Sequence, residues 1–260
     1  MVPVSGRDEI GALGAAFNEA ASDIKRRALD ARDREDALQR HVQQTAEDVT
    51  APLAGIEDRL AALAGDPRLD ETRRADLRQL LLDTHAIAAR MSNLTAVARL
   101  RTAVDRLVRQ PVDVAALVES VVTHRTPLAR AAGVDVEAAL PESPVLWDAD
   151  ADLLGQAIAN VVDNAIVHNR PGGRAWIRLQ PDVAGRGFTL AVQDDGPGVT
   201  DEAFAALRAN RRFRGDEGRS ARGGRGLGLA VAREAADRFG LQLELQRPAA
   251  GGFEVVFVVR

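Results

Sequence analysis

The stretch 160–165, which reads NVVDNA, decides the fold that we expect for this chain. Asn160 and Asn164 stand four residues apart, so on a helix their two amides share one face. Apolar residues around them supply a core-facing side, which predicts a helix over 152–167. Paired amides can bind a hydrated cation and phosphate oxygens, although two asparagines on an amphipathic helix are also common on protein surfaces.

A short acidic and glycine-rich stretch follows the strand expected over 188–193. It reads DDGPG over 194–198. Asp194 at a strand end is well placed to accept a hydrogen bond from the exocyclic amine of a base. Gly196 and Gly198 let the backbone approach a ligand closely. An ordinary turn after a strand would have the same composition.

A third stretch, GGRGLGL over 223–229, opens the helix expected over 227–239. Backbone N–H groups freed by glycines at a helix start form a site for anions such as phosphate. The stretch lacks the Gly-Lys-Ser/Thr ending of a Walker loop, and no strand leads into it as in a dinucleotide-binding fold.

In this order and at these distances, the three stretches resemble the N, G1 and G2 boxes of the histidine-kinase branch of the ATPase superfamily shared with Hsp90, gyrase and MutL. The resemblance covers about 111–260, and RFRG over 212–215 is a degraded likeness of the family's F box. The mixture of helix and strand patterns beyond 111 predicts an α+β sandwich with helices on one face of a mixed sheet, and the resemblance implies ATP and Mg²⁺ as cofactors.

The resemblance also implies roles for these residues. Asn164 would coordinate Mg²⁺, and Asn160 would support the metal and the phosphates. Asp194 would read the adenine amine. Gly196 and Gly198 would shape the adenine pocket.

Many members of this family have Lys three residues after the second Asn, where this chain has Val167. The positive charge facing the phosphates would then come from His168, Arg214 or Arg225. The glycine-rich lid that cradles the phosphates would comprise Gly224, Arg225, Gly226, Leu227 and Gly228.

The first part of the chain, about 8–107, is predicted to be almost entirely helical. Apolar residues spaced by threes and fours from Leu38 to Leu63 form the seam of a coiled coil or helical bundle. The stretch 65–67, GDP, breaks this helix, and a second helix is expected over 69–107. Two antiparallel helices form a hairpin, and two hairpins would bury their seams in a four-helix bundle, so we expect a homodimer.

The stretches 7–11 and 17–18 resemble the second helix of a HAMP linker, which in this family joins a transmembrane helix to the kinase. We therefore expect the chain to begin partway through a longer protein of the bacterial inner membrane, with this part in the cytoplasm. The expected division is a partial HAMP helix over 1–30, a dimerisation and phosphotransfer hairpin over 31–108, and a catalytic ATP-binding domain over 109–260.

The stretch 46–53, AEDVTAPL, resembles the dimerisation motif, in which a phosphoacceptor His precedes an acidic residue and then Pro-Leu. Glu47 stands at the acceptor position, and Asp48 matches the acidic neighbour that would act as general base. A carboxylate cannot form the phosphoramidate that an imidazole forms, so we expect no autophosphorylation here. Two explanations stay open: a natural pseudokinase that signals by conformation, or an engineered His→Glu change.

The resemblance implies the kinase core of a two-component sensor, whose partner is a response-regulator receiver domain. The alternative is a catalytically silent pseudokinase or a nucleotide-sensing scaffold. The 260 residues include no cysteine, which excludes disulfides and thiolate metal sites. The basic residues are spread along the chain, which argues against a nucleic-acid partner. No apolar run reaches the roughly 18 residues of a membrane-spanning helix, so we expect the chain as given to be cytoplasmic.

Overall fold

A computed structural model describes residues 9–64, 66, 68–102, 107–182, 187–209, 227–249 and 251–259. The chain divides into two compact units, Met1–Thr45 and Ala46–Arg260. All described residues of the first unit belong to helix α1 (Glu9–Ala64), and Phe17 and Ile24 are exposed there. The last turns of α1, from Ala46 onward, belong to the second unit. Among the described helices, none combines the length and the hydropathy needed to cross a lipid bilayer.

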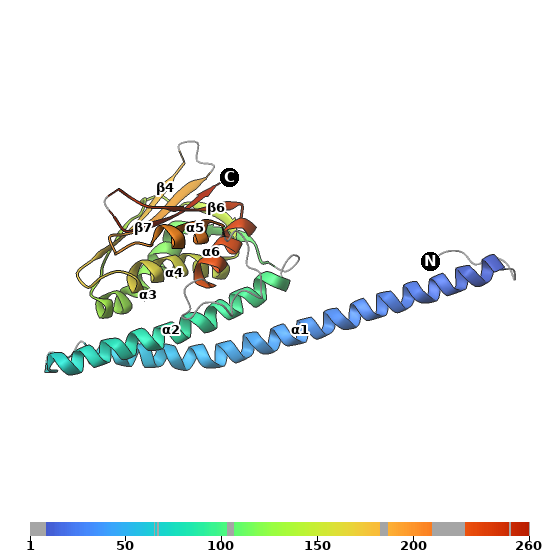
Figure 1. Cartoon of the computed structure of the whole chain (residues 1–260), viewed down its shortest axis with the longest axis horizontal. Helices are drawn as coiled ribbons and strands as arrows, with labels where there is room; N and C mark the ends of the chain where they lie inside the picture. The colour runs from blue at the N-terminus through green and yellow to red at the C-terminus, as the bar shows by residue number, and fades with distance from the viewer. Residues whose placement is uncertain are drawn as a thin grey trace. The chain divides into compact units, whose positions relative to one another are not determined.

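Helix α2 (Glu71–Thr102) turns back along the end of α1 (Figure 1). Asp66 accepts the backbone N–H of Leu69, and Arg74 donates to the carbonyls of both residues, which holds the turn together. Asp70 caps α2, because its carboxylate accepts the N–H of Arg73 at 2.9 Å. The predicted pair of helices is therefore confirmed, with α2 lying inside the range expected for it.

The rest of the second unit is built on a five-stranded mixed sheet. The first pair of strands in it is parallel, and the other three pairs are antiparallel. Two short strands, β1 (Gln110–Asp113) and β3 (Leu146–Ala149), form a separate antiparallel pair. In the five-stranded sheet, the strand order is β2 (Asp135–Ala139), β4 (Arg174–Pro181), β5 (Phe188–Asp194), β7 (Phe253–Val259) and β6 (Leu241–Gln246).

Three helices cover one face of this sheet (Figure 1): α3 (Val114–Ala132), α4 (Ala151–Val167) and α6 (Leu227–Arg238). Helix α4 contacts α3 and α6 and reaches strands β4 and β5, while α2 contacts all three helices. Buried and partly buried residues alternate along β5, as expected for the middle strand of a half-covered sheet. The predicted α+β sandwich is confirmed.

Several elements differ from the expectation. Helix α3 continues through Pro127 to Ala132, beyond the position where a proline often ends a helix, because Leu128 and Ala129 extend its buried side. Strands β1 and β3 were not predicted, since each is only four residues long and pairs with a strand far away in the sequence. Helix α5 (Asp201–Ala209) was also missed, because its nine residues are too short a window for a helical period to stand out.

Candidate functional site

Helix α4 carries both predicted asparagines. It begins at an Asp150 cap, whose carboxylate accepts the N–H of Leu153 at 3.1 Å. Asn160 is buried, and Asn164, one turn later, is half-buried. Gln156 donates its amide NH₂ to Asn160 Oδ1 at 3.4 Å, whereas Asn160 Nδ2 has no hydrogen-bond partner within the described ranges. A buried donor left unpaired costs free energy, so this atom fits an acceptor such as a phosphate oxygen.

Asp194 ends the middle strand β5. Its side chain is buried, and its Oδ1 accepts the backbone N–H of Gly196 at 2.9 Å. Burial raises the pKa of Asp194, and the backbone N–H groups of Gly196 and Phe253 offset only part of that rise. A carboxylate has room for further donors, so the free acceptor capacity of Asp194 suits a ligand N–H.

Two glycines shape the end of β5. Gly198 has a φ of 66°, which L side chains rarely adopt. A Cβ at Gly252 would stand 1.8 Å from the carbonyl oxygen of Asp194, so any side chain there would displace this strand end. Gly252 was not predicted as part of the site, although a glycine pair directly before the last strand is a signal for a tight turn.

The described parts of the second and third predicted stretches both adjoin the helix that carries the first. A Cβ added at Gly196 would be 3.2 Å from the carbonyl oxygen of His168, which directly follows α4. A Cβ added at Gly228 would be 3.3 Å from Asn160 Oδ1, so the start of α6 packs against the buried amide. The end of β5 and the start of α6 thus both adjoin α4.

The structure describes only some of the other residues that were predicted to belong to the site. His168 is exposed, and its backbone N–H bonds to the carbonyl of Asn164 at 3.1 Å. Leu227 is the first residue of α6, and Asp48 is exposed on α1. Outside what the structure describes lie the side chain of Glu47 and the residues Arg214, Gly224, Arg225 and Gly226.

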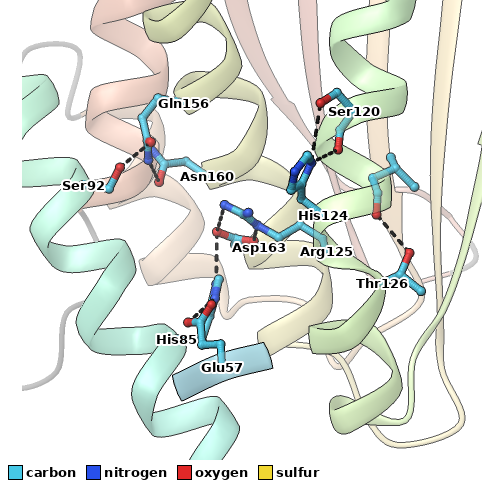
Figure 2. A network of polar contacts seen from close by, with 11 residues as sticks. Glu57, His85, Ser92, Ser120, His124, Arg125, Thr126, Gln156, Asn160 and Asp163 are labelled. Carbon is cyan, nitrogen blue, oxygen red and sulfur yellow. Dashed lines mark hydrogen bonds and ion pairs between the residues drawn. The ribbon is translucent and has the colours of Figure 1, made fainter. Parts of the chain in front are cut away.

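Figure 2 shows a polar network on α4 that the sequence analysis missed. His85 of α2 is buried between two carboxylates: its Nδ1 lies 3.3 Å from Glu57 Oε1, and its Nε2 lies 3.2 Å from Asp163 Oδ2. Asp163 Oδ1 also accepts from Arg125 Nε of α3 at 2.6 Å. Sequence spacing gives no signal for such a network, because its members come from four different helices.

The network holds a cation at its centre. Both ring nitrogens of His85 lie within ion-pair distance of a carboxylate oxygen, an arrangement that favours the protonated imidazole. Burial lowers the pKa of His85, but Asp163 and Glu57 outweigh burial and raise it to about 9. Burial would raise the pKa of Asp163, yet His85 and Arg125 hold it below its usual value. At neutral pH this is therefore an imidazolium between carboxylates.

The part of the chain that the structure describes holds no group of three or more His, Cys, Asp or Glu side chains suited to a metal ion. Mg²⁺ does not require such a cage, because it keeps several waters and binds largely through the phosphates of its substrate. The two amides of α4 carry oxygen atoms of the kind that Mg²⁺ accepts as ligands.

With this geometry in place, the class of protein follows. Residues 149–260 match the family described as histidine kinase-, DNA gyrase B-, and HSP90-like ATPase. That range contains α4 and the two segments that adjoin it, the end of β5 and the start of α6. This part of the chain belongs to that ATPase family, as the motifs predicted.

The relatives of the whole chain are sensor histidine kinases. It is 28% identical over 268 residues to the signal transduction histidine-protein kinase AfsQ2 of Streptomyces coelicolor. The match covers 99% of this chain and 48% of AfsQ2. It is 30% identical over 260 residues to the histidine-protein kinase/phosphatase MprB of Mycolicibacterium smegmatis, over 96% of this chain and 49% of MprB. The chain thus spans about half the length of the curated relatives it matches.

A solved structure supports the fold as well. Full-length ShkA, crystallised in complex with AMPPNP, matches with a TM-score of 0.54 and 23% identity, over 85% of this chain and 45% of that one. At this identity the match concerns the fold alone. It agrees with a helical region followed by the ATPase sandwich.

Proposed function

We propose that this chain is the cytoplasmic kinase core of a transmembrane sensor histidine kinase and binds ATP with Mg²⁺. The observation that carries the proposal is the meeting of three segments at α4. Asn160 has an unpaired buried N–H donor there, Gly228 packs against its amide, and the buried Asp194 ends the neighbouring strand. The family match and the homology to sensor kinases support the same reading.

In this proposal each polar group has one task. Asp194 accepts the adenine amine, and Gly196 and Gly198 shape the adenine pocket. Asn160 and Asn164 hold the phosphates and the hydrated Mg²⁺, which neutralises part of the phosphate charge when bound. The remaining phosphate contacts are assigned to His168, Arg214 and Arg225 and to the glycine-rich lid of Gly224, Gly226, Leu227 and Gly228.

The proposal is tested by titrating the chain with ATP and with GTP in the presence of Mg²⁺. We expect saturable binding of one ATP per chain, and removal of Mg²⁺ with EDTA should weaken it. GTP presents a carbonyl where adenine presents its amine, so its affinity should be lower by at least ~100-fold. Absence of saturable ATP binding, or equal affinity for the two nucleotides, would contradict the assignment.

A homodimer is part of the proposal, and an apolar stripe on the hairpin supports it. The large hydrophobic side chains exposed on each hairpin helix recur every seven residues, the spacing of a coiled-coil seam. A stripe of this kind normally marks an interface. Its members are Val49, Ile56 and Leu63 on α1, and Leu80, Ile87 and Leu94 on α2.

Replacing Ile87 with aspartate should disrupt this dimer. Ile87 stands in the middle of the α2 half of the stripe and is 48% exposed in the single chain. A charge buried in an apolar seam should weaken association at least ~tenfold. Light scattering coupled to gel filtration measures the shift from dimer to monomer. The Ala86→Asp variant, also exposed on α2, is the control and should remain dimeric, and a dimer that survives Ile87→Asp would contradict the predicted seam.

The phosphotransfer part of the proposal concerns the parent protein. A histidine at position 47 would receive the γ-phosphate with Asp48 as general base, and a receiver-domain aspartate would then take the phosphate. A membrane anchor would lie N-terminal to the partial HAMP helix. Since Glu47 stands at the acceptor position, a nucleotide-sensing scaffold that signals by conformation is the second candidate.

A further inference from the structure

Helices α2 and α4 are joined by a ladder of polar contacts. Arg99 Nη2 donates to Asp150 at 3.0 Å, Ser92 Oγ donates to Gln156 Oε1 at 2.5 Å, and His85 pairs with Asp163 at 3.2 Å. The three α2 residues are spaced by sevens, so they share one face of that helix. Their partners run in the opposite order along α4, which makes the contacts successive rungs between two antiparallel helices.

The rung formed by His85 joins more helices than the other two. The charged ring of His85 faces Glu57 of α1 and Asp163 of α4, and Arg125 of α3 completes the pairing of Asp163. Breaking such a buried pair by removing one partner leaves an uncompensated charge, so the contact resists separation of the helices. Together with Arg99 at the other end, it fixes the register in which Ser92 meets Gln156.

The middle rung leads to the nucleotide site. With its oxygen taken by the Ser92 hydroxyl, the side chain of Gln156 directs its NH₂ to Asn160 Oδ1 (Figure 2). Asn160 is thereby held through its oxygen, and its unpaired Nδ2 is the buried atom that fits a phosphate oxygen. Gln156 is only half-buried, so packing by neighbours does not fix its rotamer alone.

From this geometry we infer that Gln156 and Ser92 are positioning residues for Asn160, through which docking of α2 and binding of the ATP phosphates favour one another. The inference rests on the proposed function, because it takes Asn160 as a phosphate-binding group. A side chain held in its binding rotamer loses less entropy when the ligand arrives. By linkage, a ligand that binds the held amide stabilises the docked helix by the same factor.

The test compares two ligands on the full chain. Ser92→Ala removes the hydroxyl, and Gln156→Met keeps the length of the side chain but removes both hydrogen bonds. Calorimetric titration should show ATP with Mg²⁺ bound about 3- to 10-fold more weakly by either variant, as expected for a lost neutral hydrogen bond. Adenosine, which lacks phosphates, should bind all three proteins equally. Ser120→Ala, the same change on an exposed position of α3, is the matched control and should bind ATP as the unchanged chain does.

The double variant separates a relay from two unrelated effects. If Ser92 acts through Gln156, adding Ser92→Ala to Gln156→Met should produce no further loss. Equal ATP affinity of the unchanged chain and both single variants would overturn the inference, as would a parallel loss of adenosine binding. Failure of the unchanged chain to bind ATP would instead refute the proposed function, and this inference with it.

Discussion

The Asp194→Asn variant is expected to lose most of its affinity for ATP while keeping its fold. Asp194 Oδ1 accepts the N–H of Gly196, and an asparagine can keep that bond. Its NH₂ would then face the adenine amine, so a donor would meet a donor. Replacing a charge-assisted acceptor in a buried site typically costs about 2 kcal/mol, which corresponds to roughly 30-fold in affinity. Isothermal titration with ATP and Mg²⁺ measures the loss directly.

The neighbouring carboxylate provides the control for this experiment. Asp195 carries the same side chain one residue later, but it is half-exposed and accepts the backbone N–H of Arg174 at 2.7 Å. An asparagine retains that acceptor, so Asp195→Asn should bind ATP nearly as the unchanged chain does. Thermal melting of both variants checks that the sheet is intact. Equal ATP affinity for the unchanged chain and the Asp194→Asn variant would remove Asp194 from the adenine site.

The second large effect is expected from Glu47→His. In the variant, a neutral imidazole nitrogen attacks the γ-phosphorus of ATP, the bond from that phosphorus to the β,γ-bridging oxygen breaks, ADP leaves, and Asp48 takes the ring proton. Incubation with radiolabelled ATP should give acid-labile phosphate on the variant at least ~tenfold above the unchanged chain. The unchanged chain should remain at background, because a carboxylate forms no phosphoramidate.

Glu47→Gln is the matched control, since it removes the charge without supplying an imidazole. Label on Glu47→His alone would support a kinase whose acceptor has been replaced. Label on neither variant, in a chain that binds ATP, would favour the scaffold that signals by conformation. Label on the unchanged chain would show that another residue, such as His41, accepts phosphate and would contradict the assignment of position 47.

The sequence predicted the helix that carries Asn160 and Asn164 and the strand that ends at Asp194, for a physical reason. Asn160 and Asn164 are related by the helical repeat, and Asp194 by the end of a strand, so local periodicity is enough to place them. The glycines at 196 and 198 follow from the same strand end. The α+β sandwich follows from the alternation of helix and strand patterns along the second half of the chain.

The contacts between α2 and α4 could not be predicted from the sequence, because they depend on tertiary packing and not on local periodicity. His85 and Asp163 lie far apart in sequence and acquire meaning only when α2 packs on α4. A histidine in a helix whose apolar stripe lies elsewhere looks like a solvated residue until its buried neighbours are known. Gly252 is similar, because the atom it must avoid, the carbonyl oxygen of Asp194, belongs to a different strand.

The last turns of α2 have a practical consequence for dissecting this molecule. Ala96 and Leu100 are buried in the same aliphatic core as the sheet and its helices, and Arg238 of α6 donates to the carbonyl of Leu100 at 2.8 Å. A fragment that begins at Leu107 would therefore lose part of its hydrophobic core, and apolar side chains that α2 now covers would be exposed to solvent. One that retains the C-terminal turns of α2 would carry its interior complete, and it is the better starting point for isolating the nucleotide-binding half.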